Sequence, residues 1–120
     1  RDLMRYGKVR RGTMEIQVVQ LTNSIALYAG LDINRGLLVS QVVKGGNAEK
    51  SGLKGGTKAV RYNASIIYLG GDIITQIDGI SIMSIADYYS VLENKLPGDE
   101  ISVTVHRDKK DLKFTVVLAE

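Results

Sequence analysis

The 120-residue sequence contains no cysteine, no tryptophan, one proline and one histidine. The absence of cysteine excludes a disulfide scaffold and a thiolate metal site, although it does not settle the compartment. No apolar run is long enough to span a bilayer. The one histidine, His106, falls in a predicted strand and precedes Arg107. This position is typical of a surface residue rather than of the base that nucleophilic catalysis requires.

Motifs for other chemistries are also missing. No Gly-x-Ser-x-Gly nucleophile turn occurs. The glycine pairs at 45–46, 55–56 and 70–71 are not followed by the Lys-Ser/Thr that opens a helix after a phosphate-binding loop. Asp72 and Asp78 are spaced like paired carboxylates, but a turn at Asp78 and a strand start at Asp72 explain them better. The chain is predicted not to be an enzyme by itself, without cofactor or metal.

What is present fits one compact domain with an ordinary apolar fraction of 44%, whose 13 glycines indicate many turns and short strands. The net charge is only +3, but basic residues crowd the first eleven positions. Tyr6 is the only aromatic residue there, which disfavours a nucleic-acid partner. Residues 1–8 are predicted to be a solvated linker. Because the sequence opens on Arg1 rather than Met, we expect a piece of a longer protein.

Apolar periodicity and turn residues predict an α+β fold. Five or six strands and two helices, without regular βαβ alternation, favour a partly open barrel. One predicted helix is capped by Thr22 or Asn23 and stops at Gly30, and a single helical turn is capped by Asn47. The remaining predicted elements are strands in 14–21, 36–43, 71–77 and 80–82, a hairpin of 59–62 with 65–69, a helix over 85–95 capped by Ser84, and closing strands at 101–107 and 111–118 joined by a turn at 108–110.

The stretch 11–21 is the most informative part of the sequence. Gly12 forms a turn that leads into a strand, and such a turn can point successive backbone N–H groups at one anion. If the strand has a free edge, an extended peptide can pair with it. The helix over 85–95 carries apolar residues on two stripes, one with Ile85, Tyr89 and Leu92 and the other with Tyr88 and Val91. It is therefore predicted both to pack on the core and to line a groove.

The order of these elements resembles a PDZ domain, in the circularly permuted form attached to bacterial HtrA/Deg-type serine proteases. The resemblance implies a linker from an upstream protease domain at 1–11, a PDZ domain at 12–120 and a β-hairpin inserted at 57–71. The matching stretches are 6–12, which looks like the junction between the two domains, 36–42, 48–56, 71–79 and 96–99.

The resemblance also implies a function. PDZ domains bind the last residues of a protein, or an exposed hydrophobic stretch, as an added strand. By position, the resemblance assigns the carboxylate-binding loop to Thr13, Met14, Glu15 and Ile16, and the peptide-pairing strand to Gln17, Val18 and Val19. The groove helix and pocket would use Ile85, Tyr89 and Leu92. Arg11 or Arg10 would be an auxiliary contact to the carboxylate.

Glu15 departs from the family pattern, in which this loop position is usually glycine. A positive φ here would strain a non-glycine residue. A carboxylate a few ångströms from the ligand's own carboxylate would repel it by about 1 kcal/mol in water-like surroundings. Strand alternation is expected to point the side chain away, towards solvent or Arg11. We therefore expect peptide binding that is micromolar at best or less dependent on a free C-terminus.

Two alternatives stay open. The domain could serve assembly, docking on its own protease domain or on a neighbouring subunit of a homo-oligomer. It could instead belong to another protease class, such as a C-terminal-processing protease or an intramembrane metalloprotease, although the junction from Tyr6 to Gly12 argues against this. The family implies the bacterial periplasm or another extracytoplasmic location, and peptides or protein C-termini as partners. Neither nucleic-acid binding nor direct membrane insertion is expected.

Overall fold

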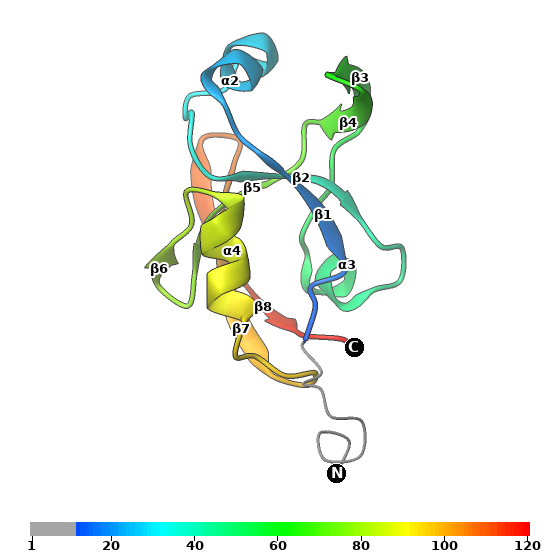
Figure 1. Cartoon of the computed structure of the whole chain (residues 1–120), viewed down its shortest axis with the longest axis vertical. Helices are drawn as coiled ribbons and strands as arrows, with labels where there is room; N and C mark the ends of the chain where they lie inside the picture. Colours follow the sequence, from blue (N-terminus) through cyan, green and yellow to red (C-terminus); the bar gives the residue numbers. More distant parts are fainter. Residues whose placement is uncertain (1–11) are drawn as a thin grey trace.

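The computed structural model describes residues 12–120. These residues form a six-stranded antiparallel sheet, a separate two-stranded hairpin and three helices, which confirms the predicted α+β class (Figure 1). No helix in this range is long and apolar enough to cross a membrane. The elements are β1 (Ile16–Gln20), α2 (Asn23–Ala29), β2 (Leu37–Val42), α3 (Asn47–Ser51), β3 (Lys58–Tyr62), β4 (Ser65–Leu69), β5 (Ile73–Ile77), β6 (Ile80–Ser81), α4 (Ile85–Leu92), β7 (Glu100–Arg107) and β8 (Lys110–Val117).

The main sheet curls into a partly open barrel. Its strand order is β1-β2-β5-β7-β8, with β6 paired to β5. Beyond β8, Ala119 pairs with Thr13 just before β1, through N–O distances of 2.8 and 2.9 Å. This bridge returns the last strand to the first. The interior is filled by apolar residues from every wall, among them Leu37, Val39, Ile74, Ile77, Val103, Val105 and Val116.

The helices follow the predicted capping signals with two corrections. Thr22 and Ser84 accept backbone N–H bonds at the starts of α2 and α4, as expected. The predicted cap of α3 at Asn47 is wrong, because Gly46 is the N-cap and Asn47 is the first helical residue. Helix α4 ends at Leu92 rather than at Lys95. The chain turns there, and the Lys95 carbonyl accepts a bond from the Gly12 N–H at 3.1 Å.

The turn between β7 and β8 is also shorter than expected. Only Asp108 and Lys109 lie outside the strands, and both have positive φ (51° and 65°). Two consecutive left-handed residues suit a two-residue hairpin, because their twist matches that of the flanking strands. Lys110, predicted as part of the turn, is instead the first residue of β8.

A β-bulge in β2 anchors the β3–β4 hairpin. Gln41 pairs with Gln17 and Val39 pairs with Val18, so Ser40 has no partner in β1. The Ser40 carbonyl instead accepts the Gly56 N–H at 2.8 Å, and its hydroxyl oxygen accepts the Tyr68 N–H at 3.0 Å. The hairpin therefore docks on the residue that the main sheet leaves unpaired.

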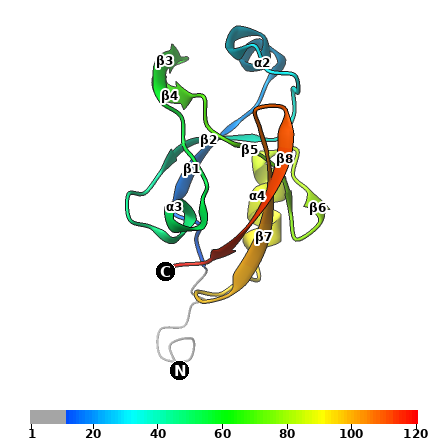
Figure 2. The same ribbon diagram turned by 180° about the vertical axis from the view of Figure 1, so that it is seen from behind.

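The glycine pairs that bracket the hairpin are required by close backbone approach. A Cβ on Gly71 would lie 2.2 Å from the Val39 carbonyl oxygen, and one on Gly56 would lie 2.2 Å from that of Tyr68. No side chain fits at these distances. Together with α2, the hairpin forms the end of the molecule opposite the C-terminus in both views (Figures 1 and 2).

An ion pair between Asp72 and Arg107 joins three parts of the fold. Asp72 is 1% exposed, and its carboxylate accepts bonds from Arg107 Nε (2.6 Å), Arg107 Nη2 (2.7 Å) and the Lys54 N–H (3.0 Å). The guanidinium also donates to the Gly52 carbonyl and lies over the Phe114 ring. Asp72, noted above as one of two spaced carboxylates, is thus fully engaged in structural contacts.

His106 bridges two carboxylates outside the core. Its Nδ1 lies 2.9 Å from Asp111 and its Nε2 lies 2.9 Å from Asp32, so both ring nitrogens are engaged. The hydrogen bonds to Asp111 and Asp32 raise the pKa of His106, and the bond to His106 lowers the pKa of Asp32. The protonated imidazole thereby ties the loop after α2 to the β7–β8 hairpin.

Replacing Asp72 with alanine is expected to lower the free energy of unfolding by about 3 kcal/mol, because it leaves the Arg107 guanidinium and the Lys54 N–H without their partner. Urea unfolding followed by circular dichroism measures the loss. Asp72→Asn, which keeps an acceptor oxygen but not the charge, should fall between alanine and the original chain. Unchanged stability of Asp72→Ala would contradict this role.

Replacing His106 with glutamine is expected to destabilise the chain more at pH 5.5 than at pH 8.5. The folded-state pKa of His106 is raised above its ordinary 6.5, so protonation favours the folded state. That contribution is fully present below about pH 6.5 and is lost as pH rises through the folded-state pKa. Urea unfolding at both pH values gives the comparison. An equal loss at both would show that the charged bridge adds nothing.

Candidate functional site

Strand β1 pairs with β2 on one side, and within residues 12–120 no strand pairs with its other side. At its start, the Val43 N–H donates to the Glu15 carbonyl at 3.0 Å. In an antiparallel ladder this bond makes the facing pair Ile16 and Val42 a non-hydrogen-bonded one. The backbone N–H and C=O of Ile16 therefore point away from β2.

The same alternation holds at the other end of β1. The Leu21 N–H donates to the Gly36 carbonyl at 3.1 Å. Counting back along the ladder, the backbone groups of Gln20 and Val18 also point away from β2, whereas those of Val19 face it. Strand β1 thus presents the backbone of alternate residues along an open edge.

A groove of about 630 Å³ runs along this edge, between β1 and α4. The volume lies within the range typical of ligand pockets. Residues predicted for the loop, the strand and the helix come together there. Those that line it are Thr13, Met14, Glu15, Ile16, Gln17, Val18, Ile85, Tyr89 and Leu92, with Gly12, Tyr88 and Glu93 in addition.

One part of the predicted site lies elsewhere, and another falls outside the described residues. Val19 does not line the groove. It packs against a second apolar cluster on the side of α2 and the hairpin, formed by Leu21, Ile25, Ala26, Leu38, Ile67, Leu69 and Ile73. Its place follows from alternation, since Val18 and Val19 point to opposite faces of the sheet. Arg10 and Arg11 lie outside the described residues.

The floor of the groove is apolar. Met14 and Leu92 belong to the apolar interior of the barrel and are buried. Ile16, Val18 and Ile85 are partly buried against that interior. These side chains come from the two walls and meet beneath the open edge of β1. The floor can therefore accept an apolar side chain from a ligand, at a gain of about 1.5–3 kcal/mol for full burial.

Tyr88 and Tyr89 give α4 two kinds of surface. Tyr89 is 63% exposed, whereas Tyr88 is 6% exposed, and burial raises the pKa of the Tyr88 phenol. The rings lie 5.4 Å apart. Tyr88 was predicted on the second apolar stripe of the helix but not in the pocket, and that stripe was the signal that could have placed it there.

The loop before β1 contains the left-handed residue that the resemblance required. Glu15 has φ of 60°, a conformation that costs a non-glycine residue about 1–2 kcal/mol. Its side chain was expected to point towards solvent or Arg11. It turns instead towards α3, where Oε1 accepts the Asn47 N–H at 3.1 Å. The positive end of this short helix favours the carboxylate. Gly46 leaves the space, since a Cβ there would lie 3.0 Å from that oxygen.

The loop also leaves backbone donors available. The Thr13 N–H is bonded to Ala119, but within the described range no hydrogen-bond acceptor is found for the N–H groups of Met14 and Glu15. With the outward N–H of Ile16, three successive donors are open at one end of the groove. This arrangement can hold an anion such as a carboxylate.

Gln20 holds the other end of the groove together, a role that the sequence did not reveal. Its Nε2 donates to the Met83 carbonyl at 2.7 Å, and its Oε1 accepts the Ile85 N–H at 2.9 Å. One side chain thus ties the end of β1 to the start of α4 and fixes the distance between the two walls.

The other candidate groups have structural partners. Asp78 Oδ1 accepts the Ser102 N–H, and its Oδ2 lies 3.1 Å from Lys95 Nζ. The Ser102 bond is the main cause that lowers the pKa of Asp78. No group of three His, Cys, Asp or Glu side chains able to hold a metal ion occurs within residues 12–120.

The sequence of the chain is similar to those of known proteins. The sequence profile of the PDZ domain matches residues 12–118. The chain is 29% identical over 117 residues to the periplasmic pH-dependent serine endoprotease DegQ of Escherichia coli, covering 98% of the chain and 22% of that protein. It is 32% identical over 109 residues to a probable periplasmic serine protease do/HhoA-like of Haemophilus influenzae, covering 91% and 20%. The chain spans about a fifth of these relatives.

Solved structures share the fold. The HtrA-type protease AlgW with a decapeptide aligns with a TM-score of 0.75 at 24% identity, over 98% of this chain and 32% of that one. The HtrA3 PDZ domain bound to a phage-derived ligand aligns with a TM-score of 0.68 at 16% identity, over 90% and 85%. The chain therefore belongs to the PDZ domain family, and it is similar over nearly its whole length to segments of HtrA/Deg-type serine proteases.

Proposed function

We propose that this chain is the peptide-binding PDZ module of an HtrA/Deg-like serine protease, which recognises C-terminal or exposed hydrophobic segments of substrate proteins. One observation carries the proposal: the open backbone edge of β1 faces the apolar wall of α4 across a single groove. A ligand in that groove can form main-chain hydrogen bonds on one side and bury its side chains on the other, which is recognition by strand addition.

In the proposed complex the peptide runs antiparallel to β1. Its main chain bonds to the outward groups of Ile16 and Val18, and its last side chain enters the apolar floor beside Met14 and Leu92. A terminal carboxylate is held by the N–H groups that lead into β1. One buried apolar side chain supplies about 1.5–3 kcal/mol, so strand pairing must supply most of a micromolar affinity, equivalent to about −8 kcal/mol.

Glu15 does not stand against this mode of binding. Its carboxylate is engaged by Asn47 and turned from the groove, so the ligand's carboxylate meets the loop backbone first. The same bond offsets part of the cost of the left-handed turn. Glu15 thus acts as a positioning residue that holds the loop in the shape the carboxylate needs.

The proposal extends to the parent protein. Residues 1–11 would link the module to an upstream protease domain that holds the catalytic triad, and the hairpin around β3 and β4 would be an insertion. Binding would recruit substrates or relay their presence to the protease. The location would be the bacterial periplasm, because the similar proteins are periplasmic proteases. Partners would include the module's own protease domain and, through the parent, further subunits.

The second candidate is an assembly role, in which the module docks on its own protease domain or on a neighbouring subunit. The observation that favours it is the β3–β4 hairpin, which adds surface away from the groove. A PDZ domain of another protease class is the third. The gene sequence upstream of Arg1 separates the third candidate from the proposal, because a Ser–His–Asp protease domain there supports the proposal and its absence overturns it.

Replacing Leu92 with glutamate is expected to reduce binding of a peptide with an apolar C-terminus at least tenfold, because a charge would occupy the apolar floor. Calorimetric titration measures the loss, and circular dichroism checks that the variant folds. Tyr89→Ala, at an exposed position, should weaken binding several-fold without threatening the fold.

Leu27→Glu is the matched control, since Leu27 is 83% exposed on α2 and far from the groove. It should bind like the original chain. If folded Leu92→Glu and Tyr89→Ala both bind as tightly as the original, the groove is not the site. Amide signals of Met14 to Val18 that stay unchanged at saturating peptide would favour the assembly role.

Replacing Glu15 with glutamine is expected to change the affinity for the same peptide less than about twofold, because the carboxylate faces α3 and glutamine keeps an acceptor for the Asn47 N–H. A carboxylate facing the ligand would repel it by about 1 kcal/mol, so the variant would then bind about fivefold tighter. Glu93→Gln, which removes the carboxylate on the α4 side of the groove, is the comparison under the same titration.

A further inference from the structure

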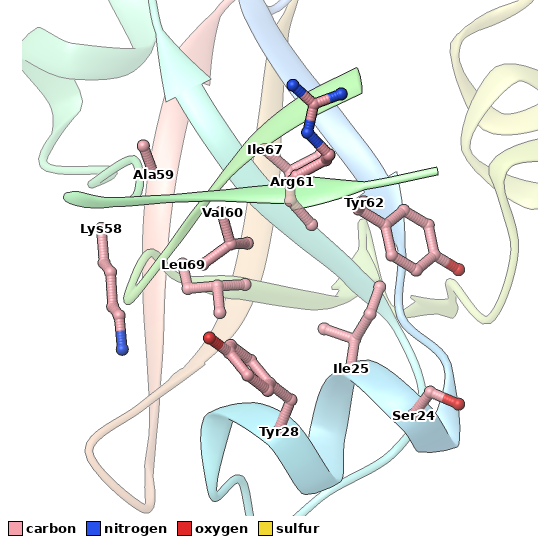
Figure 3. Close-up of a pocket in the computed structure, with 10 residues that line it drawn as sticks. All are labelled: Ser24, Ile25, Tyr28, Lys58, Ala59, Val60, Arg61, Tyr62, Ile67 and Leu69. Atoms are coloured by element: carbon pink, nitrogen blue, oxygen red, sulfur yellow. The ribbon is translucent and has the colours of Figure 1, made fainter. Parts of the chain in front are cut away.

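A second cleft lies at the opposite end of the domain, between α2 and the β3–β4 hairpin. Its volume is about 520 Å³. Figure 3 shows Val60 and Leu69 of the hairpin pointing towards Ile25 and Tyr28 of α2. Ile25 and Leu69 are buried, and Tyr28 is 66% exposed at the mouth. The cleft is therefore a formed apolar pocket that the groove along β1 does not use.

One edge of this cleft is an open strand edge. Strand β3 pairs only with β4 among the strands of residues 12–120. The Tyr68 N–H is bonded to the Ser40 hydroxyl and not to β3, so the facing pair of Tyr68 and Ala59 is a non-hydrogen-bonded one. The backbone groups of Ala59, and of Arg61 two residues on, therefore point outward from the hairpin.

The edge is positively charged. Lys58 and Arg61 are exposed on β3, and no acidic side chain is among the described residues that line the cleft. Figure 3 shows the Lys58 side chain on the α2 side, where Nζ lies 5.7 Å from the centre of the Tyr28 ring. The Arg61 side chain points to the opposite side of the strand. A strand added here would meet one cation on each of its faces.

The hairpin is also anchored to the rest of the domain. The hairpin is fixed by the bonds of Gly56 and Tyr68 to Ser40, and its inner face packs with α2 in one apolar cluster. A ligand would not have to order the strand that it joins, which lowers the entropy cost of binding.

We propose that the free edge of β3 and the adjoining cleft form a second binding site, which takes an extended acidic segment of another protein as a third strand. Side chains of such a strand alternate between the two faces. Apolar residues opposite Val60 and Tyr62 would enter the cleft, while acidic residues opposite Lys58 and Arg61 would pair with these cations. Self-pairing of two β3 edges is disfavoured, because it would bring four cations together.

The test uses the 120-residue chain and two synthetic peptides, acetyl-Leu-Glu-Val-Thr-Glu-amide and acetyl-Leu-Lys-Val-Thr-Lys-amide, titrated to millimolar concentration and followed by amide NMR shifts. Both peptides lack a free carboxyl terminus, so the result does not depend on carboxylate binding at the β1 groove. The acidic peptide is expected to shift the amide signals of Ala59 and Arg61 and to leave those of Met14 to Val18 in place. The basic peptide should shift neither.

The double variant Lys58→Glu, Arg61→Glu is expected to weaken binding of the acidic peptide about tenfold and to gain binding of the basic one. The matched control, Lys44→Glu with Lys113→Glu, makes the same charge change at exposed positions away from the hairpin and should bind like the original chain. Equal amide shifts with both peptides would overturn the proposal, as would an acidic peptide that shifts only the signals of Met14 to Val18 or none. It would also be overturned by a double variant that binds the acidic peptide as tightly as the original chain, or by signals of Ala59 and Arg61 that shift with protein concentration in the absence of peptide.

Discussion

The fold depends on the buried ion pair of Asp72 and Arg107. Asp72 begins the path into β5, where its own carbonyl accepts the Val39 N–H and its N–H donates to the Lys54 carbonyl. Arg107 closes β7 and reaches the Gly52 carbonyl at the end of α3. A charge this deeply buried is tolerated only when its hydrogen bonds are complete. The strands beside the hairpin, the end of α3 and the β7–β8 ribbon are therefore positioned around one carboxylate.

The open edges of β1 and β3 follow from how this scaffold closes. The bridge between Thr13 and Ala119 ends the barrel before β1 can gain a second neighbour, and the bond between Gln20 and the start of α4 keeps a groove open beside it. Strand β3 is held away from the main sheet because β4 occupies the contact with Ser40. Exposed edges are aggregation hazards in general. Here the edge of β1 faces α4 across the groove, and the edge of β3 borders the cleft that α2 lines.

Much of this could be predicted from the sequence, because the signals were local. Thr22, Gly30 and Ser84 marked helix ends through their own side chains or backbone freedom, and the glycine pairs marked the hairpin. The groove residues were placed by resemblance. The predictions that failed depended on long-range contacts. Asn47 was predicted as an N-cap, but its N–H bonds to Glu15, which lies 32 positions away in the sequence. Helix α4 was predicted to reach Lys95, whose carbonyl instead bonds to the N–H of the distant Gly12. Gln20 looked like any polar strand residue, since nothing nearby reveals its partners on α4.

The bulge at Ser40 couples the hairpin to the main sheet. If the hairpin (57–71) were deleted, the Ser40 hydroxyl oxygen would lose the Tyr68 N–H, and a buried polar group without a partner costs about 1–3 kcal/mol. If Ser40 were deleted instead, β2 would regain regular pairing with β1, but the hairpin would lose its anchor. The hairpin and the bulge are therefore coupled, because the hydrogen bonds that anchor the hairpin end on the residue that the bulge leaves unpaired.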